Sequence, residues 1–154
     1  YYYYGINKHW RDDKIFGVFK HHVREPKEPI VRGFDDEFFV PHSRNSYLKT
    51  YEVIAHKDEV DIICDGVNIG PYLMMSKDKR NIFVFGHSEY EAYTLSDEYF
   101  RDKAKGMEIN LPENYFPQDN PALTPPNVWR SHGNLLFSNW LNYYVYQETP
   151  YKFE

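Results

Sequence analysis

The sequence contains a single cysteine, Cys64, and one thiol cannot close an internal disulfide. This argues against the small secreted domains that depend on disulfides. Basic residues are fewer than acidic ones, 18 against 23, and they form no basic block, which argues against a nucleic-acid-binding protein. No apolar run approaches the length that crosses a membrane, and no signal-peptide pattern opens the chain. We therefore expect a cytoplasmic protein that binds neither nucleic acid nor membrane.

Aromatic residues, in contrast, make up 19% of the chain, with 15 Tyr and 11 Phe, which argues against disorder. The 154 residues have the length of one domain with a single core. The opening Tyr1–Tyr4, closed by Gly5, has the pattern of a last helical turn with a glycine C′ residue. Because no initiator Met precedes it, we expect the chain to begin inside an element and an N-terminal part of the domain to be missing.

The run Ile82–Phe85 predicts a strand buried on both faces, because its apolar residues follow one another without alternation. Gly86 ends the run, and His87 and Glu89 follow it. Residues two apart on an extended segment point the same way, so these two side chains can share one side of the strand end. A carboxylate beside an imidazole fixes its tautomer and stabilises its protonated form, as in a nucleophile–His–acid relay. The spacing alone favours an ordinary strand-end ion pair.

Two further polar candidates adjoin predicted strands. Lys14 precedes the apolar run of a strand expected at residues 14–19, where a cation could reach a cleft, although such a lysine is usually solvated. Residues 30–40 read as strand, turn and strand, and Ser43 and Arg44 follow on a loop, where polar residues often contact ligands. An arginine can bind a carboxylate through two parallel hydrogen bonds. The alternative for Ser43 is a turn in which it caps its own backbone.

The next segments predict a β-meander and then a helix. Strands are expected at residues 51–55, 60–64 and 72–75, leading into the strand at 82–85. A helix should begin with Thr94 as its N-cap, run to about Lys105 and stop at Gly106. Its buried stripe is predicted to comprise Leu95, Tyr99 and Phe100. Arg101 lies beside this stripe, so that its guanidinium can reach a cleft, with a plain surface arginine as the alternative.

The C-terminal part predicts a loop and a long helix. Residues 111–126 are rich in proline, and Tyr115 and Phe116 should anchor them as an ordered loop. Residues 128 to about 147 show apolar positions at helical spacing, which predicts an amphipathic helix packed on the sheet and ended by Pro150. Gly133 inside this helix costs about 1 kcal/mol relative to alanine, so we expect a close backbone contact there.

The remaining reactive side chains do not suggest a site of their own. His21 and His22 are adjacent on a predicted strand and point to opposite faces, so they cannot chelate one metal well. Cys64 follows apolar residues and precedes a hairpin turn, whereas an activated cysteine sits on a strand-to-helix turn among small residues. A free cysteine in such surroundings usually behaves as a small buried hydrophobe. The sequence therefore assigns no metal ligand and no nucleophile.

Five segments together carry a resemblance to a known family. They are residues 32–36 (Arg-Gly-Phe-Asp-Asp), 41–44 (Pro-His-Ser-Arg), 86–90 (Gly-His-Ser-Glu-Tyr), 99–102 (Tyr-Phe-Arg-Asp) and 129–144. Over nearly its whole length the chain resembles the homoserine O-acyltransferases of methionine biosynthesis, which include homoserine O-succinyltransferases and homoserine O-acetyltransferases. The last segment is highly specific, whereas Gly-His-x-Glu alone would also fit class I glutamine amidotransferases.

The resemblance implies an α/β fold like that of class I glutamine amidotransferases, a flavodoxin-like three-layer sandwich, with residues 1–154 as its C-terminal portion only. It also implies a two-step transfer. A cysteine thiolate takes an acetyl or succinyl group from acyl-CoA as a thioester, and the homoserine hydroxyl then attacks that thioester. Acyl-CoA is a co-substrate, and no bound cofactor or metal is expected. This chain has Gly-His-Ser-Glu in place of Gly-His-Pro-Glu, and this difference favours acetyl-CoA over succinyl-CoA as the acyl donor.

The resemblance also implies roles for individual residues. His87 matches the family's general base and Glu89 the acid that orients it. Lys14 and Ser43 match residues that contact the substrate. Arg101 matches the arginine that pairs with the carboxylate of homoserine, which suits a forked cation.

The family's nucleophile lies on a strand–turn–helix upstream of the Tyr-rich opening, so the resemblance implies that this chain lacks it. The isolated chain is therefore expected to be inactive, and its exposed apolar surface could lead to a homodimer. Two alternatives stay open. One is a class I glutamine amidotransferase-like hydrolase with the same His/Glu geometry, and the other is a non-catalytic fragment that serves only folding or assembly.

Overall fold

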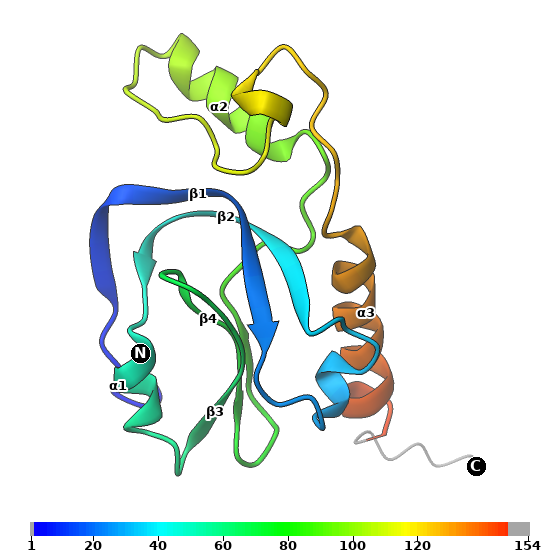
Figure 1. Ribbon diagram of the computed structural model, residues 1–154. Coiled ribbons are helices and arrows are strands. Elements are labelled where there is room, and N and C mark those ends of the chain that lie inside the picture. The colour runs from blue at the N-terminus through cyan, green and yellow to red at the C-terminus, as the bar shows by residue number, and fades with distance from the viewer. Residues whose placement is uncertain (1, 148–154) are drawn as a thin grey trace, which may run out of the picture.

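The computed structural model describes residues 2–147, and its strands form one antiparallel sheet in the order β2-β1-β3-β4-β5 (Figure 1). The strands are β1 (His9–Val23), β2 (Glu37–Tyr47), β3 (Val60–Gly66), β4 (Gly70–Ser76) and β5 (Ile82–Val84). The helices are α1 (Thr50–Ile54), α2 (Thr94–Ala104) and α3 (Arg130–Trp140), with the short helical segments η1 (Pro29–Val31), η2 (Pro117–Asp119) and η3 (Leu141–Val145). The chain is thus an α/β protein with a curled antiparallel sheet.

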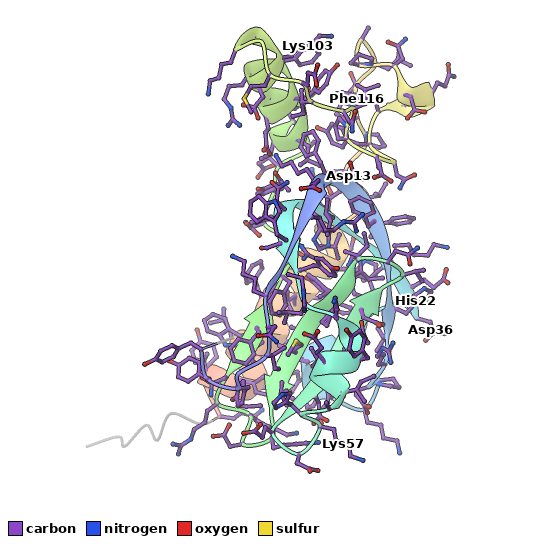
Figure 2. All side chains as sticks on the ribbon, turned by 90° about the vertical axis from the view of Figure 1, so that its left-hand side faces the viewer. Asp13, His22, Asp36, Lys57, Lys103 and Phe116 are labelled. Carbon is purple, nitrogen blue, oxygen red and sulfur yellow. The ribbon has the colours of Figure 1, made fainter. Side chains whose placement is uncertain are left out.

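Two main cores hold this arrangement together. The first lies between the sheet and α3, and its buried members are Ile30, Val31, Phe38, Val40, Ile63, Cys64, Tyr72, Leu73, Met75 and Leu136. The second lies beneath α2 and the loop that follows it, and comprises Phe16, Val18, Leu95, Tyr99, Tyr115, Phe116 and Trp129. In Figure 2, Lys103 and Phe116 mark this second region, and Asp13 marks the bend of β1 below it. Residues 85–93 connect β5 to α2 and therefore join the two cores.

Strand β2 is longer than the sequence predicted. Residues 30–40 were expected to form two strands, but Pro29–Val31 is the helical turn η1, and β2 runs from Glu37 through Pro41 to Tyr47. A proline can occupy position 41 because β2 is an edge strand. The N–H that proline lacks would face away from β1, so no hydrogen bond between the two strands is lost. Ser43 and Arg44 consequently lie on a strand and not on the predicted loop.

The expected β-meander is confirmed over β3, β4 and β5, which pair antiparallel in sequence order. The strand predicted at residues 51–55 is wrong, since Thr50–Ile54 forms helix α1. The strand at 82–85 is not buried on both faces either. It is the edge strand β5, and Val84 is 45% exposed.

The helices agree with their predicted bounds but differ in detail. Helix α2 spans Thr94–Ala104 with Gly106 beyond it at φ 75°, as expected for a helix stop. Its N-cap is Tyr93 without a side-chain bond, and Phe100 is 46% exposed, so the predicted cap and part of the predicted stripe are wrong. The C-terminal helix is α3 followed by η3, and Pro150 lies outside the described residues. Tyr115 and Phe116 are buried and anchor their loop as predicted.

Gly17 of β1 allows the loop at residues 111–126 to pack directly against the sheet. It has φ 144°, and a Cβ atom at this position would lie 2.3 Å from the carbonyl oxygen of Glu113. On either side, the Glu113 N–H donates to the Phe16 carbonyl and the Val18 N–H donates to the Glu113 carbonyl, at 2.9 and 2.8 Å. Only glycine permits this approach of two backbones.

We predict that Gly17→Ala lowers the free energy of unfolding by more than about 2 kcal/mol, because both backbone bonds must open to admit a methyl group. Urea unfolding followed by circular dichroism measures this change. Gly106→Ala is the control, since Gly106 has φ 75° but no atom within 4 Å of the added Cβ. It should lose about 1 kcal/mol through backbone strain alone. Equal losses in the two variants would contradict the proposed packing.

Candidate active site

The turn after β5 is held by backbone hydrogen bonds to two different strands. The Phe85 N–H donates to the Tyr72 carbonyl of β4 at 2.8 Å, and the His87 N–H donates to the Pro41 carbonyl of β2 at 2.9 Å. The Tyr90 N–H then donates to the His87 carbonyl at 3.1 Å and closes a turn. The turn thus bridges the two ends of the sheet, because β2 and β5 are its outermost strands.

Two glycines allow other parts of the chain to lie directly against this turn. A Cβ atom on Gly86 would lie 2.5 Å from Val40 Cγ1 and 3.0 Å from His42 Cε1. A Cβ atom on Gly133 of α3 would lie 2.7 Å from the Ser88 carbonyl oxygen. The close backbone contact predicted at Gly133 is therefore confirmed. Because the turn is packed from both sides, its backbone has little freedom to move.

His87 and Glu89 form a pair on this turn, as their spacing predicted. His87 Nδ1 donates to Glu89 Oε1 at 2.8 Å, and the imidazole stacks on the Tyr90 ring at 4.4 Å between centroids and an interplanar angle of 10°. With the proton on Nδ1, the lone pair is on Nε2, which is the arrangement that a general base needs. The His87 side chain is 38% exposed, so a reactant can reach it.

Glu98 of α2 brings together the three predicted substrate-binding residues. Its Oε1 accepts hydrogen bonds from Lys14 Nζ at 2.5 Å and from Ser43 Oγ at 2.8 Å, and lies 3.8 Å from Arg101 Nη2. The Glu98 side chain is only 16% exposed. Glu98 was not among the residues predicted from the sequence. Its position three residues before Arg101, on the same helix face, was the available signal.

Arg101 also has a second carboxylate partner. Its Nε and Nη2 atoms donate to the two oxygens of Asp102 at 2.7 and 3.0 Å, in the forked geometry typical of arginine. This hydrogen bonding lowers the pKa of Asp102 and raises that of Arg101. The Arg101 side chain is 56% exposed, so it remains accessible from solvent.

Tyr90 stacks on His87 and interacts electrostatically with both Glu89 and Glu98. Burial raises the pKa of Tyr90, and the negative charges of Glu98 and Glu89 raise it further. The backbone of Tyr90 is fixed as well, because its carbonyl accepts a hydrogen bond from Trp129 Nε1 at 2.8 Å. The structure therefore places one neutral phenol within the electrostatic reach of both carboxylates.

Two buried histidines lie beneath the turn. His21 Nδ1 donates to the Phe19 carbonyl at 2.9 Å, and Arg44 Nε donates to His42 Nδ1 at 3.2 Å. These contacts leave one consistent tautomer pair, in which His42 Nε2–H donates to His21 Nε2 at 3.1 Å. Both imidazoles are neutral, since burial lowers the pKa of His21 to about 4 and lowers that of His42 well below its usual range.

Cys64 is fully buried in the first core, where burial raises the pKa of its thiol. A thiol that resists ionisation and has no access to solvent is a poor nucleophile. His21 is buried while the side chain of His22 is 40% exposed, so the two point to opposite faces. Among residues 2–147, no helix is long and apolar enough to cross a bilayer.

Comparisons with known proteins agree with this picture. A crystal structure of SMU.1228c superposes with a TM-score of 0.58 at 14% identity, over 88% of this chain and 55% of that one, which shows a shared fold. The family model described as homoserine O-succinyltransferase matches residues 1–151. A homoserine O-acetyltransferase from Acetivibrio thermocellus is 50% identical over 151 residues, 98% of this chain and 49% of that protein. A homoserine O-succinyltransferase from Aliivibrio fischeri is 51% identical, over 98% of this chain and 48% of that protein.

The fold and the paired histidine and glutamate thus place the chain among α/β proteins with an exposed, carboxylate-oriented imidazole. More narrowly, the chain belongs to the homoserine O-succinyltransferase family. It spans about half the length of the curated relatives that it matches.

The buried histidine pair predicts a loss of stability in acid. Below pH 6.5 the unfolded chain binds protons that the folded His21 and His42 do not, so the free energy of unfolding falls as the pH decreases from 6.5 to about 4. His21 alone should account for roughly 3 kcal/mol of this loss. Urea unfolding at pH 7, 5.5 and 4.5 measures it. His21→Gln should flatten the dependence, and His22→Gln should leave it unchanged. Equal slopes in all three proteins would refute the assignment.

Proposed function

We propose that this chain forms the half of a homoserine O-acyltransferase that carries the general base and the amino-acid-binding groups. The observation that best supports this proposal is the hydrogen bond of 2.8 Å between His87 Nδ1 and Glu89 Oε1, on the turn after β5. In this proposal His87 Nε2 takes the proton from the γ-hydroxyl of homoserine as that oxygen attacks a thioester. Glu89 holds the imidazole in the required tautomer and stabilises the imidazolium.

The amino-acid end of homoserine binds at the cluster around Glu98. Homoserine is a zwitterion, and the site offers a forked cation and a carboxylate close together. The substrate carboxylate takes the place of Asp102 on Arg101, and the substrate ammonium is received by Glu98. Lys14 and Ser43 keep Glu98 in position and supply further donors. This assignment is supported by the distances of 2.5 to 3.8 Å that join the three residues to Glu98.

The nucleophile in this proposal is a cysteine thiolate supplied by polypeptide that this chain does not contain. Two observations support it: Cys64 is buried in the core, and the relatives are about twice as long as the chain. Acyl-CoA provides the acyl group, and the relatives' names include both acetyl- and succinyltransferases. We favour acetyl-CoA because of Ser88 in the Gly-His-Ser-Glu segment. We also propose that the complete fold is a three-layer sandwich of the class I glutamine amidotransferase type. The proposed location of the protein is the cytoplasm.

The His/Glu geometry alone would also suit a glutamine amidotransferase-like hydrolase. Membership of the homoserine O-succinyltransferase family over residues 1–151 favours acyl transfer instead. Glutamine hydrolysis without acyl-CoA is the observation that would reverse this preference.

We predict that acyl transfer appears when the chain is co-expressed with the N-terminal half of the Acetivibrio thermocellus relative. Release of CoA thiol from acetyl-CoA, dependent on homoserine, measures the activity. His87→Ala should lower it about 10²- to 10⁴-fold, because a positioned base contributes that much. Glu89→Gln should lower it less, since the imidazole remains.

His56→Ala is the matched control. His56 is also a histidine paired with a nearby glutamate, with Nδ1 at 3.1 Å from Glu59 Oε2, but it lies on the segment after α1. Its variant should keep the full activity. Undiminished turnover in His87→Ala would refute the role given to His87.

A further inference from the structure

Tyr72 of β4 holds the turn that carries His87 at two points. Its backbone carbonyl accepts a hydrogen bond from the Phe85 N–H at 2.8 Å. Its side-chain hydroxyl shares a hydrogen bond of 2.6 Å with the hydroxyl of Ser88. One residue of the sheet is therefore bonded to the turn both before and after His87 in the sequence.

The Tyr72 side chain is itself fixed in the core. It is 1% exposed, and its ring lies 5.1, 5.7 and 6.5 Å from the rings of His21, Phe38 and His42 between centroids. Burial raises the pKa of Tyr72, so its hydroxyl stays protonated. A buried hydroxyl needs a hydrogen-bond partner, and in the described part of the chain the Tyr72 hydroxyl has Ser88 in this role.

The other contacts of the imidazole do not replace this attachment. Glu89 and Tyr90, which touch the His87 side chain, both follow it within three residues. They orient the imidazole within the turn, but they do not bond the turn to a strand. The placement of His87 relative to the sheet therefore depends on Pro41 of β2, which accepts its N–H, and on Tyr72 of β4.

We propose that Tyr72 is a positioning residue for the general base, and that its hydroxyl acts through Ser88 to keep the His87 imidazole in place for proton transfer. The proposal rests on the proposed function, in which His87 is that base. Tyr72 is buried and does not contact the substrate, so its hydroxyl affects the rate of transfer and not the binding of homoserine. Small displacements of a catalytic group are costly, because the reacting atoms must be aligned.

The first test is amide hydrogen exchange of this chain, followed by NMR. Tyr72→Phe keeps the ring and the backbone carbonyl and removes only the hydroxyl. We expect the His87 amide to exchange about tenfold faster, because one hydrogen bond that holds the turn is lost. The Glu113 amide, which donates to the Phe16 carbonyl at 2.9 Å, should change less than threefold. Equal acceleration of both amides would indicate a general loss of stability and contradict the proposal.

The second test is turnover, with this chain co-expressed with the N-terminal half of the Acetivibrio thermocellus relative. Tyr72→Phe should lower kcat about three- to tenfold and change KM for homoserine less than twofold. Ser88→Ala removes the same hydrogen bond from the other side and should lower kcat equally. The double variant should be no slower than either single variant. Losses that multiply in the double variant, or a change in KM that exceeds the change in kcat, would contradict the proposal.

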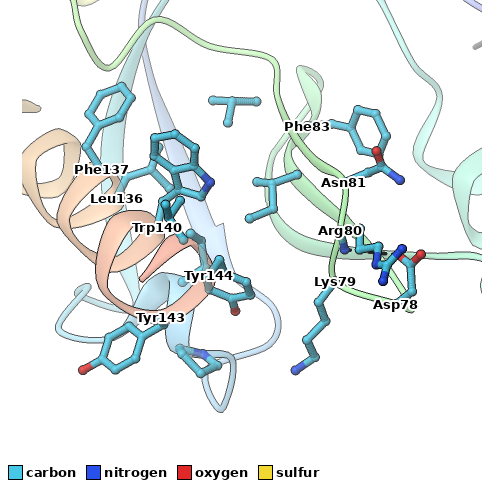
Figure 3. A pocket seen from close by; sticks show the side chains of 15 residues that line it. Asp78, Lys79, Arg80, Asn81, Phe83, Leu136, Phe137, Trp140, Tyr143 and Tyr144 are labelled. Carbon is cyan, nitrogen blue, oxygen red and sulfur yellow. Dashed lines mark hydrogen bonds between the residues drawn. The ribbon is translucent and has the colours of Figure 1, made fainter. Parts of the chain in front are cut away.

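Tyr143→Phe is the matched control. The Tyr143 hydroxyl also has a hydrogen-bond partner, since Arg32 Nη1 donates to it at 2.9 Å, but Tyr143 lies on η3. Figure 3 shows Tyr143 on the helical side of a groove of about 870 Å³ that lies between β5 and the segment formed by α3 and η3. This variant should keep the original exchange rate of the His87 amide and the original kcat.

Circular dichroism checks that each variant is folded, and Ser88→Ala serves alone if Tyr72→Phe is not. If neither variant folds, the proposal is contradicted, because the hydrogen bond would then hold the whole fold and not the turn. An unchanged His87 amide in the folded variants contradicts the proposal as well, whatever the turnover.

Exchange and turnover separate this proposal from the proposed function. Faster exchange of the His87 amide in Tyr72→Phe, with no acyl transfer by the original chain, supports the attachment of the turn and contradicts the acyltransferase assignment. Full turnover in folded Tyr72→Phe supports the assignment and contradicts the positioning role.

Discussion

The hydrogen bond from the His87 N–H to the Pro41 carbonyl ties the two outermost strands of the sheet together. It fixes the imidazole relative to β2, and Ser43 lies on the same strand two residues after Pro41. Gly86 makes the bond geometrically feasible, because any side chain there would meet Val40 and His42. Strand β2 thus positions both the proposed base and one proposed substrate contact, Ser43.

Charge holds the other half of the site in place. Glu98 is surrounded by two cations and a hydroxyl, and its side chain is mostly buried. Charge interactions at such a buried site are stronger than at an exposed surface. Arg101 stays partly exposed and pairs with Asp102, and in the proposed function a substrate carboxylate replaces this partner. In this account the site is assembled before the substrate arrives, which is the arrangement that lowers the cost of binding.

The sequence predicted the features that depend on local pattern. The bounds of α2, the meander of β3 to β5 and the contact at Gly133 follow from spacing and from glycine placement. The failures have physical reasons. Residues 51–55 are rich in strand-forming residues, yet they form α1 after a short turn, since propensity is a weak prior. Ser43 lies on a strand because an edge position tolerates Pro41. For Glu98 the sequence offered only the spacing from Arg101, because its contacts with Lys14 and Ser43 are created by the fold.

The location of the acyl group is the most direct test of the account. The two co-expressed halves are treated with acetyl-CoA in the absence of homoserine, quenched in acid, and analysed by peptide mass spectrometry. The account predicts one acetyl group on a cysteine of the complementing N-terminal half and none on this chain. A thioester on Cys64 would contradict the account. So would a His87→Ala variant whose acetylated cysteine passes its acetyl group to homoserine at the original rate.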